Sequence, residues 1–151
     1  PTLLGDSLGS NPHKRGGRIS PDGRWLAYVS ASESSGRDEI YVRSFAAAAA
    51  DTWQISSHGG IEPQWRGDGR ELFFHAQDGK LMARAIEETA GAVTVGTPTA
   101  LVEFLPSGNL VAPYYGTTPD GQRFLLNTIV DSDRLVPLSV LLNWQAALRQ
   151  P

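Results

Sequence analysis

The stretch SPDGRWLAYVS, residues 20–30, carries the clearest structural signal in the chain. A cluster of turn-forming residues is followed by a run of aromatic and β-branched residues. In an Asp-Gly pair the glycine accepts a positive φ without steric cost, and the aspartate side chain can hydrogen-bond the local backbone. The stretch therefore predicts a β-hairpin whose tight turn contains Asp22 and Gly23.

The same arrangement occurs twice more along the chain. Residues 64–75 read QWRGDGRELFFH, and residues 116–127 read GTTPDGQRFLLN. The three Asp-Gly pairs, which start 46 and then 52 residues apart, are Asp22-Gly23, Asp68-Gly69 and Asp120-Gly121. A period of roughly 40–50 residues is typical of repeat architectures, so each pair is expected to mark one hairpin of a repeating unit.

Further strands are expected after each hairpin. Short apolar runs follow at 39–45, 80–86 and 138–144, and the first two alternate with period 2, which is typical of half-buried strands. Additional strands are predicted at 52–56 and near 99–104, giving about four strands per unit. Four-stranded units at this spacing are typical of β-propeller blades. The sequence thus predicts an all-β fold of about three four-stranded antiparallel blades.

The predicted boundaries place blade 1 at 18–60, blade 2 at 61–108 and blade 3 at 109–151. Residues 1–17 are interpreted as a linker or a remnant of a preceding blade. The third blade is expected to be one strand short, because 143–149 favours a short helix or turn. Propellers usually close with four to eight blades, and each blade is apolar on both faces. We therefore expect a larger or oligomeric propeller, completed by upstream blades of a longer gene product or by a second copy.

The SPDG turn followed by a hydrophobic strand resembles the TolB-type, WD40-like (PD40) propeller repeat. A second resemblance covers nearly the whole chain, through EIYVR at 39–43, WQIS at 53–56, GGIEPQW at 59–65 and VLLNW at 140–144. This order is similar to the C-terminal end of the propeller appended to bacterial eukaryotic-like serine/threonine kinases. The resemblance implies that a cytoplasmic kinase domain precedes the propeller, often across a membrane span, so an extracytoplasmic location is favoured in that case and the compartment is otherwise open.

Phosphotransfer itself is not expected in these residues. A kinase needs a Gly-rich loop, an ATP-contacting lysine, a His-Arg-Asp catalytic loop and an Asp-Phe-Gly metal site, and the sequence contains none of these. The chain is interpreted as a non-catalytic module for protein–protein interaction or sensing, with binding carried by loops at the propeller rim. Two alternatives stay open: a TolB-like periplasmic partner-binding protein, and the gating propeller of a prolyl-oligopeptidase-like serine peptidase.

Three features of the sequence bear on catalysis or metal binding. Residues 5–9, GDSLG, fit a nucleophile elbow, but only four residues precede them, too few for the central strand that this chemistry needs. His13, His58 and His75 lack metal-ligand spacing and are expected to be solvated or capping histidines. The segment 131–133, DSD, lacks the glycine and terminal glutamate of a calcium loop. No catalytic residue, metal site or cofactor is therefore predicted.

Composition narrows the possible partners. The chain of 151 residues is 40% apolar and 19% charged with a net charge of −3, which argues against a nucleic-acid partner. It has no cysteine, and no apolar run reaches the roughly 18–20 residues of a membrane span. The alanine run at 46–50 is interpreted as a loop insertion. Most of the four tryptophans are expected to pack within blades: Trp25, Trp53, Trp65 and Trp144.

Overall fold

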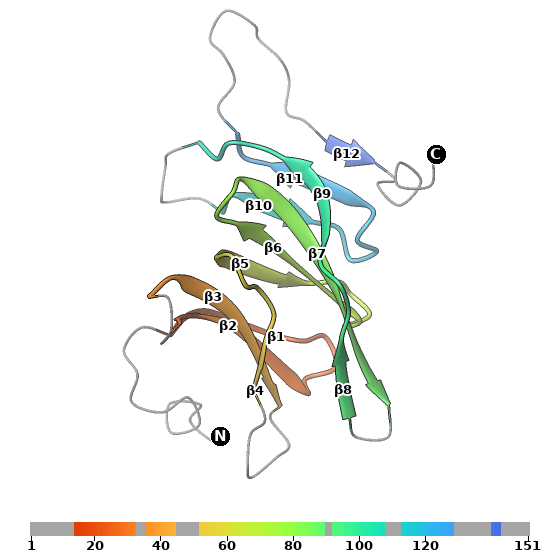
Figure 1. Ribbon diagram of the computed structural model, residues 1–151. Coiled ribbons are helices and arrows are strands. Elements are labelled where there is room, and N and C mark those ends of the chain that lie inside the picture. The colour runs from red at the N-terminus through yellow and green to blue at the C-terminus, as the bar shows by residue number, and fades with distance from the viewer. Residues whose placement is uncertain are drawn as a thin grey trace, which may run out of the picture.

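The computed structural model describes residues 14–32, 36–44, 52–89, 92–107, 113–128 and 140–142. Within these ranges every regular element is a β-strand, and the strands form three antiparallel sheets that follow one another in chain order (Figure 1). The prediction of an all-β fold with antiparallel sheets is therefore confirmed. Residues 5–9, His13, the 46–50 alanine run, 131–133 and the predicted helix or turn at 143–149 lie outside the described residues.

The first sheet has the strand order β1-β2-β3-β4. Its strands are β1 (Arg15–Ile19), β2 (Trp25–Ala31), β3 (Asp38–Ser44) and β4 (Thr52–Gln54). The predicted strands at 39–45 and 52–56 correspond to β3 and β4. β1 begins at Arg15 and pairs with β2 through a register shift between Arg15 and Arg18.

The second sheet has five strands, one more than expected. They are β5 (Gly60–Trp65), β6 (Glu71–Ala76), β7 (Lys80–Thr89), β8 (Ala92–Val95) and β9 (Thr99–Glu103). The additional strand is possible because β7 is ten residues long. Its first half pairs with β9 and its second half with β8, so one long strand supports two partners along the same edge.

The third sheet is smaller. It consists of β10 (Tyr115–Thr117), β11 (Arg123–Leu126) and β12 (Val140–Leu142) in that order. The described residues of this sheet provide three strands, and β12 lies inside the run predicted at 138–144.

Two hydrophobic cores lie between successive sheets. Leu72, Phe74 and Ala76 of β6 face the first sheet, where Trp25 and Val42 belong to the same buried cluster. The alternate residue Phe73 belongs to a second buried cluster with Leu81, Phe104, Tyr115, Phe124 and Leu126, which joins the second sheet to the third. Because neighbouring strand residues point to opposite faces, β6 contributes to both cores, and this explains its continuous apolar run.

The tryptophans pack as expected where they are described. Trp25 is 7% exposed, and Trp53 and Trp65 pack against the core between the first two sheets. Trp25 and Trp53 meet edge to face with ring centroids 5.6 Å apart, a favourable arrangement for aromatic pairs. Trp144 lies outside the described residues.

Candidate functional site

The three Asp-Gly turns have the same hydrogen-bond pattern. The amide of the glycine donates to the carbonyl three residues earlier: Gly23 to Ser20 at 2.9 Å, Gly69 to Arg66 at 2.9 Å and Gly121 to Thr118 at 2.8 Å. All three glycines have a positive φ, between 68° and 73°, a conformation in which a side chain is unfavourable. The repeat seen in the sequence is therefore also a repeat in backbone geometry.

Successive turns touch one another. The Gly67 amide donates to the Pro119 carbonyl at 2.7 Å, which joins the turn of the second sheet to that of the third. A Cβ on Gly121 would lie 2.8 Å from Arg66 Cδ and 2.9 Å from Phe73 Cζ. These turns thus hold neighbouring sheets together, and the first two of them, with Glu87 and Glu88 of β7, line a cavity of about 390 Å³.

The first strand of each sheet lies at a sheet edge, and hydrogen bonds connect these three strands. Trp65 Nε1 of β5 donates to the Arg18 carbonyl of β1 at 3.0 Å. Gln64 Nε2 of β5 donates to the Tyr115 carbonyl of β10 at 2.8 Å, and Tyr115 Oη donates to the Glu62 carbonyl at 2.7 Å. Side chains of one strand thus satisfy backbone carbonyls of the next, which fixes β1, β5 and β10 relative to one another.

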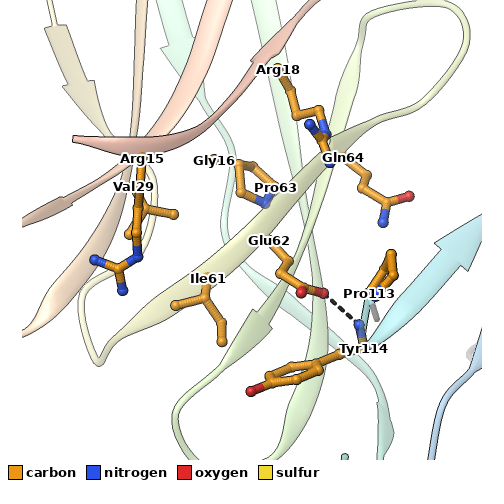
Figure 2. A pocket seen from close by; sticks show the side chains of 10 residues that line it. All are labelled: Arg15, Gly16, Arg18, Val29, Ile61, Glu62, Pro63, Gln64, Pro113 and Tyr114. Carbon is orange, nitrogen blue, oxygen red and sulfur yellow. Dashed lines mark hydrogen bonds between the residues drawn. The ribbon is translucent and has the colours of Figure 1, made fainter. Parts of the chain in front are cut away.

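A cavity of about 460 Å³ opens beside these strands, and we call it the first-strand cleft (Figure 2). Its lining comes from β1, β5, one residue of β2 and the segment before β10: Arg15, Gly16, Arg18, Val29, Ile61, Glu62, Pro63, Gln64, Pro113 and Tyr114. β1 is exposed along its whole length. The cleft therefore combines an accessible edge strand with apolar walls and three charged side chains.

Glu62 has the least common backbone conformation in the cleft. Its φ is 54°, and it is the one non-glycine residue with a positive φ within the described ranges. Its side chain accepts a hydrogen bond from the Tyr114 amide at 2.7 Å, drawn as a dashed line in Figure 2. A strained conformation of this kind persists only where surrounding contacts hold it, and such residues cluster at binding and active sites.

The charges of the cleft belong mainly to β1. Arg15 donates from Nη1 to Asp38 Oδ1 at 2.9 Å and forms a second bond from Nη2 to Asp38. This hydrogen-bonded pairing raises the pKa of Arg15 although partial burial opposes the shift. Arg18 is exposed. Burial raises the pKa of Tyr115 well above its ordinary value, so its hydroxyl stays a hydrogen-bond donor to Glu62.

A second cavity, of about 580 Å³, adjoins the cleft and shares Ile61 and Tyr114 with it. We call it the His75 cavity. Its further lining residues are Gly36, Arg37, Asp38, Gly60, His75, Gln77, Leu105, Pro106 and Ser107. The two cavities are therefore neighbours that have the side chains of Ile61 and Tyr114 in common.

The expectation of a solvated or capping His75 is wrong. His75 is 7% exposed, and its ring lies edge-on to Phe104 and Tyr114 with centroids 4.9 Å and 5.5 Å away. The physical reason is the alternation of β6: His75 follows Phe73 on the face that packs toward the third sheet. Desolvation lowers the pKa of His75, against smaller opposing effects of a Phe104 backbone hydrogen bond and the Asp78 charge.

His58 is exposed in the loop before β5, and its surroundings do not form a catalytic triad. Ser57 Oγ lies 3.0 Å from His58 Nδ1, and Asp78 lines the same 130 Å³ cavity. Asp78 Oδ2, however, pairs with Lys80 Nζ at 2.7 Å. A triad needs a carboxylate bonded to the histidine, and no bond joins His58 to Asp78, both of which are described.

Among the described residues, no group of three or more His, Asp or Glu side chains could hold a metal ion. Within the same ranges, no helix is long and apolar enough to cross a bilayer. Sequence reasoning missed the cavities because their walls combine residues from separate repeats. The positive φ of Glu62 could not be predicted either, because nothing in the sequence indicates that this glutamate adopts such a backbone conformation.

Comparisons with known proteins do not assign the chain to a family. No protein-family model matches the chain, and no curated protein matches it in sequence. The structure defines an all-β protein of successive antiparallel sheets, with a cleft beside their first strands.

Proposed function

We propose that this chain is a section of a β-propeller, with three consecutive blades that act as a non-catalytic module for protein–protein interaction or sensing. The observation that carries the proposal is the repetition in space of one unit. Three antiparallel sheets follow in chain order, with the same turn geometry and with first strands connected by side-chain hydrogen bonds to backbone carbonyls. In propellers the first strands of successive blades line the central channel, and the first-strand cleft corresponds to part of that wall.

The exposed far face of the third sheet supports a continuation of the propeller. Arg123 and Leu125 of β11 are exposed, whereas Phe124 and Leu126 face the second sheet. Further blades of the same polypeptide, or a second copy, would cover that face. From the resemblance given above, we propose that the complete protein is a bacterial signalling kinase with this module at its C-terminal end.

The cleft is the proposed binding surface for a protein partner. β1 is an exposed edge strand, and edge strands bind extended peptides through main-chain hydrogen bonds while neighbouring pockets select side chains. Arg15 and Arg18 on one side and Glu62 on the other add charges that orient a bound segment.

Site-specific photo-crosslinking in cells that express the complete protein tests this function. A photoreactive amino acid replaces Arg18 in the cleft, and a matched control replaces Arg70, which is also exposed but lies directly after the Asp68-Gly69 pair. We expect one discrete crosslinked protein from position 18 and none from position 70. Identical products from both positions, or no product from position 18, would contradict a partner site in the cleft.

A second test addresses the proposed architecture. The coding sequence upstream of Pro1 should contain further Asp-Gly blade repeats and, before them, a kinase domain. Absence of additional repeats, together with a monomeric mass in light scattering, would rule out the propeller proposal.

A further inference from the structure

We propose that the first-strand cleft binds an acidic side chain, a glutamate or an aspartate, of an extended segment of the protein partner, and that this side chain occupies the space beside Gly16. The inference rests on the proposed function and adds the chemical class of the residue that is recognised. It starts from a comparison of β1 with β5, because equivalent positions carry a glycine in β1 and a glutamate in β5.

Gly16 of β1 and Glu62 of β5 are equivalent positions of the repeat. The Asp-Gly turns of the first two sheets start 46 residues apart, and the difference between 62 and 16 is also 46. Both residues have a positive φ, 65° for Gly16 and 54° for Glu62. The place in the repeat and the backbone conformation therefore agree, although the side chains differ.

Both positions lie in a bulge of the first strand. The register of β1 with β2 shifts between Arg15 and Arg18, and the register of β5 with β6 shifts between Ile61 and Gln64, again 46 residues later. Bulges interrupt the ladder of a sheet, re-aim side chains and are over-represented beside functional sites. Here the residues of both bulges line the first-strand cleft.

At the bulge of β5 the glutamate side chain connects two sheets. The carboxylate of Glu62 accepts a hydrogen bond from the Tyr114 amide at 2.7 Å, in the segment before β10 (Figure 2). A carboxylate at this position of the repeat thus reaches toward the first strand of the next sheet. The bulge of β1 has no side chain for the same role, because its residue is a glycine.

The space beside Gly16 is open. Apart from the chain neighbours of this glycine, a Cβ built on it would come within 4 Å of one atom, Val29 Cγ2, at the ordinary contact distance of 3.6 Å. Gly16 and Val29 both line the cavity of about 460 Å³. The cleft therefore has room for a side chain at the place where β1 itself provides none, and a bound segment can supply it.

The charges around Gly16 favour an acidic group. Arg15 and Arg18 belong to the same strand and line the cleft. Arg15 is paired with Asp38, whereas none of the ion pairs between described residues includes the exposed Arg18. A guanidinium can donate two parallel hydrogen bonds to one carboxylate. Since the Glu62 carboxylate is already hydrogen-bonded on the β10 side of the cleft, Arg18 provides the charge that binds an incoming acidic side chain.

The test is an NMR titration of the intact chain with two blocked peptides, Ac-Thr-Val-Glu-Val-Thr-NH₂ and its counterpart with glutamine at the centre. The two peptides have nearly the same shape, so the ratio of their affinities measures the effect of the charge. At low salt we expect the glutamate peptide to bind about twofold to fivefold more tightly, as an exposed ion pair implies. This preference should disappear at about 1 M salt, where the screening length is about 3 Å.

Two variants and a control complete the test. Gly16→Glu provides from the chain itself the side chain proposed for the ligand, and Glu62 shows that a glutamate is accommodated in this conformation. It should weaken the glutamate peptide by more than about tenfold, through steric overlap and like charge. Gly23→Glu, with a φ of 73° and no atom within 4 Å of its Cβ, is the matched control outside the cleft and should leave both affinities unchanged. Arg18→Gln, at an exposed position, should remove the preference for glutamate even if Gly16→Glu does not fold.

The outcomes separate this inference from the proposed function. Equal affinities of the two peptides, no binding of either, or an unchanged affinity in Gly16→Glu would overturn the inference. A photoreactive amino acid at Pro113, which is exposed and lines the cleft, leaves Arg18 in place for partner capture. A partner that crosslinks from position 113 equally well with and without Arg18→Gln would overturn the inference and leave the proposed function intact. Selective binding of the glutamate peptide, with no crosslinked partner from position 18 or 113, would support the acidic-residue site and contradict the protein-interaction function.

Discussion

In β6 the neighbouring residues Phe73 and Phe74 are 0% and 3% exposed, whereas in β11 Phe124 is 1% exposed and its neighbour Leu125 is 48% exposed. Both strands follow an Asp-Gly turn and occupy the same position in their sheets. The central sheet is thus buried on both faces and the third sheet on one. A strand is therefore buried only on the faces that other parts of the chain cover: β6 is covered on both faces and β11 on one, while β2 of the first sheet is also buried on both.

The largest effect is expected for truncations in β6. Phe73→Ala and Phe74→Ala should each destabilise the chain by about 3–5 kcal/mol, because each leaves a cavity in a different core. Phe73 packs edge to face on Phe124 with centroids 4.9 Å apart, while Phe74 belongs to the core shared with the first sheet. Chemical denaturation of the purified variants measures both values. A large loss for one variant alone would show that the central sheet is not held from both sides.

A smaller loss of stability is expected for substitutions in the Asp-Gly turns of the first and third sheets. Gly121→Ala should cost about 1–3 kcal/mol more than Gly23→Ala. Both glycines have a positive φ, 68° and 73°, so the backbone penalty is shared. The new methyl group at 121 would meet Arg66 and Phe73, whereas at 23 nothing lies within 4 Å. Thermal unfolding of the two variants measures this difference in stability. Equal losses of stability would mean that the turn at Gly121 is not tightly packed against the central sheet.

Much of this comparison could be predicted from the sequence, because it rests on local patterns. The Asp-Gly turns, the strands at 39–45, 80–86 and 99–104, and the all-β class follow from turn chemistry and period-2 alternation. Each blade was expected to be apolar on both faces, but nothing local distinguished a core histidine at 75 from a solvated one. That distinction depends on Phe104 and Tyr114, which lie 29 and 39 residues further along the chain.

The cavities were beyond prediction for a related reason. The first-strand cleft combines β1, β5 and the segment before β10, and no single repeat contains enough of its wall to be recognised. The fifth strand of the second sheet was missed because it depends on β7 continuing past the point where β9 stops pairing with it. Local patterns specify strands and turns, whereas binding regions depend on how separate units meet.

A further pair of substitutions tests the exposed face of the third sheet. Leu125→Ala should change the free energy of unfolding by no more than about 0.5 kcal/mol, the usual range for exposed positions. Its neighbour Phe124→Ala should cost about 3–5 kcal/mol, since Phe124 is buried against Phe73. Denaturation of the chain by itself provides the measurement. A loss above 2 kcal/mol for Leu125→Ala would indicate that a second copy covers this face in solution, and the loss should then depend on protein concentration.

The smallest expected effect is on the pKa values of the aspartates in the turns of the central and third sheets. Asp68 in the central turn and Asp120 in the third both have a lowered pKa, but from different causes. For Asp68 the main cause is a hydrogen bond from the Arg66 guanidinium, 2.6 Å away, and for Asp120 it is a hydrogen bond from the Thr118 hydroxyl. A lowered pKa in the folded state means that each carboxylate stabilises the fold above its ordinary value near 3.8, and that this contribution is lost as the pH falls through the folded pKa.

Salt should separate the two carboxylates. At about 1 M salt the screening length falls to about 3 Å, so the charge-dependent part of the Asp68 shift should shrink and its pKa should rise. The pKa of Asp120 depends mainly on an uncharged hydroxyl group and should move less. Titration of the carboxyl ¹³C signals at low and high salt measures both pKa values, with Asp22 as a third reference.

Burial raises the pKa of Asp22, but hydrogen bonds from Ser20 and Arg24 outweigh it and lower the value to about 2. Because Asp22 combines a hydroxyl and a guanidinium donor, its response to salt should fall between those of Asp120 and Asp68, and an identical response of all three would show that the turns of the central and third sheets are electrostatically equivalent.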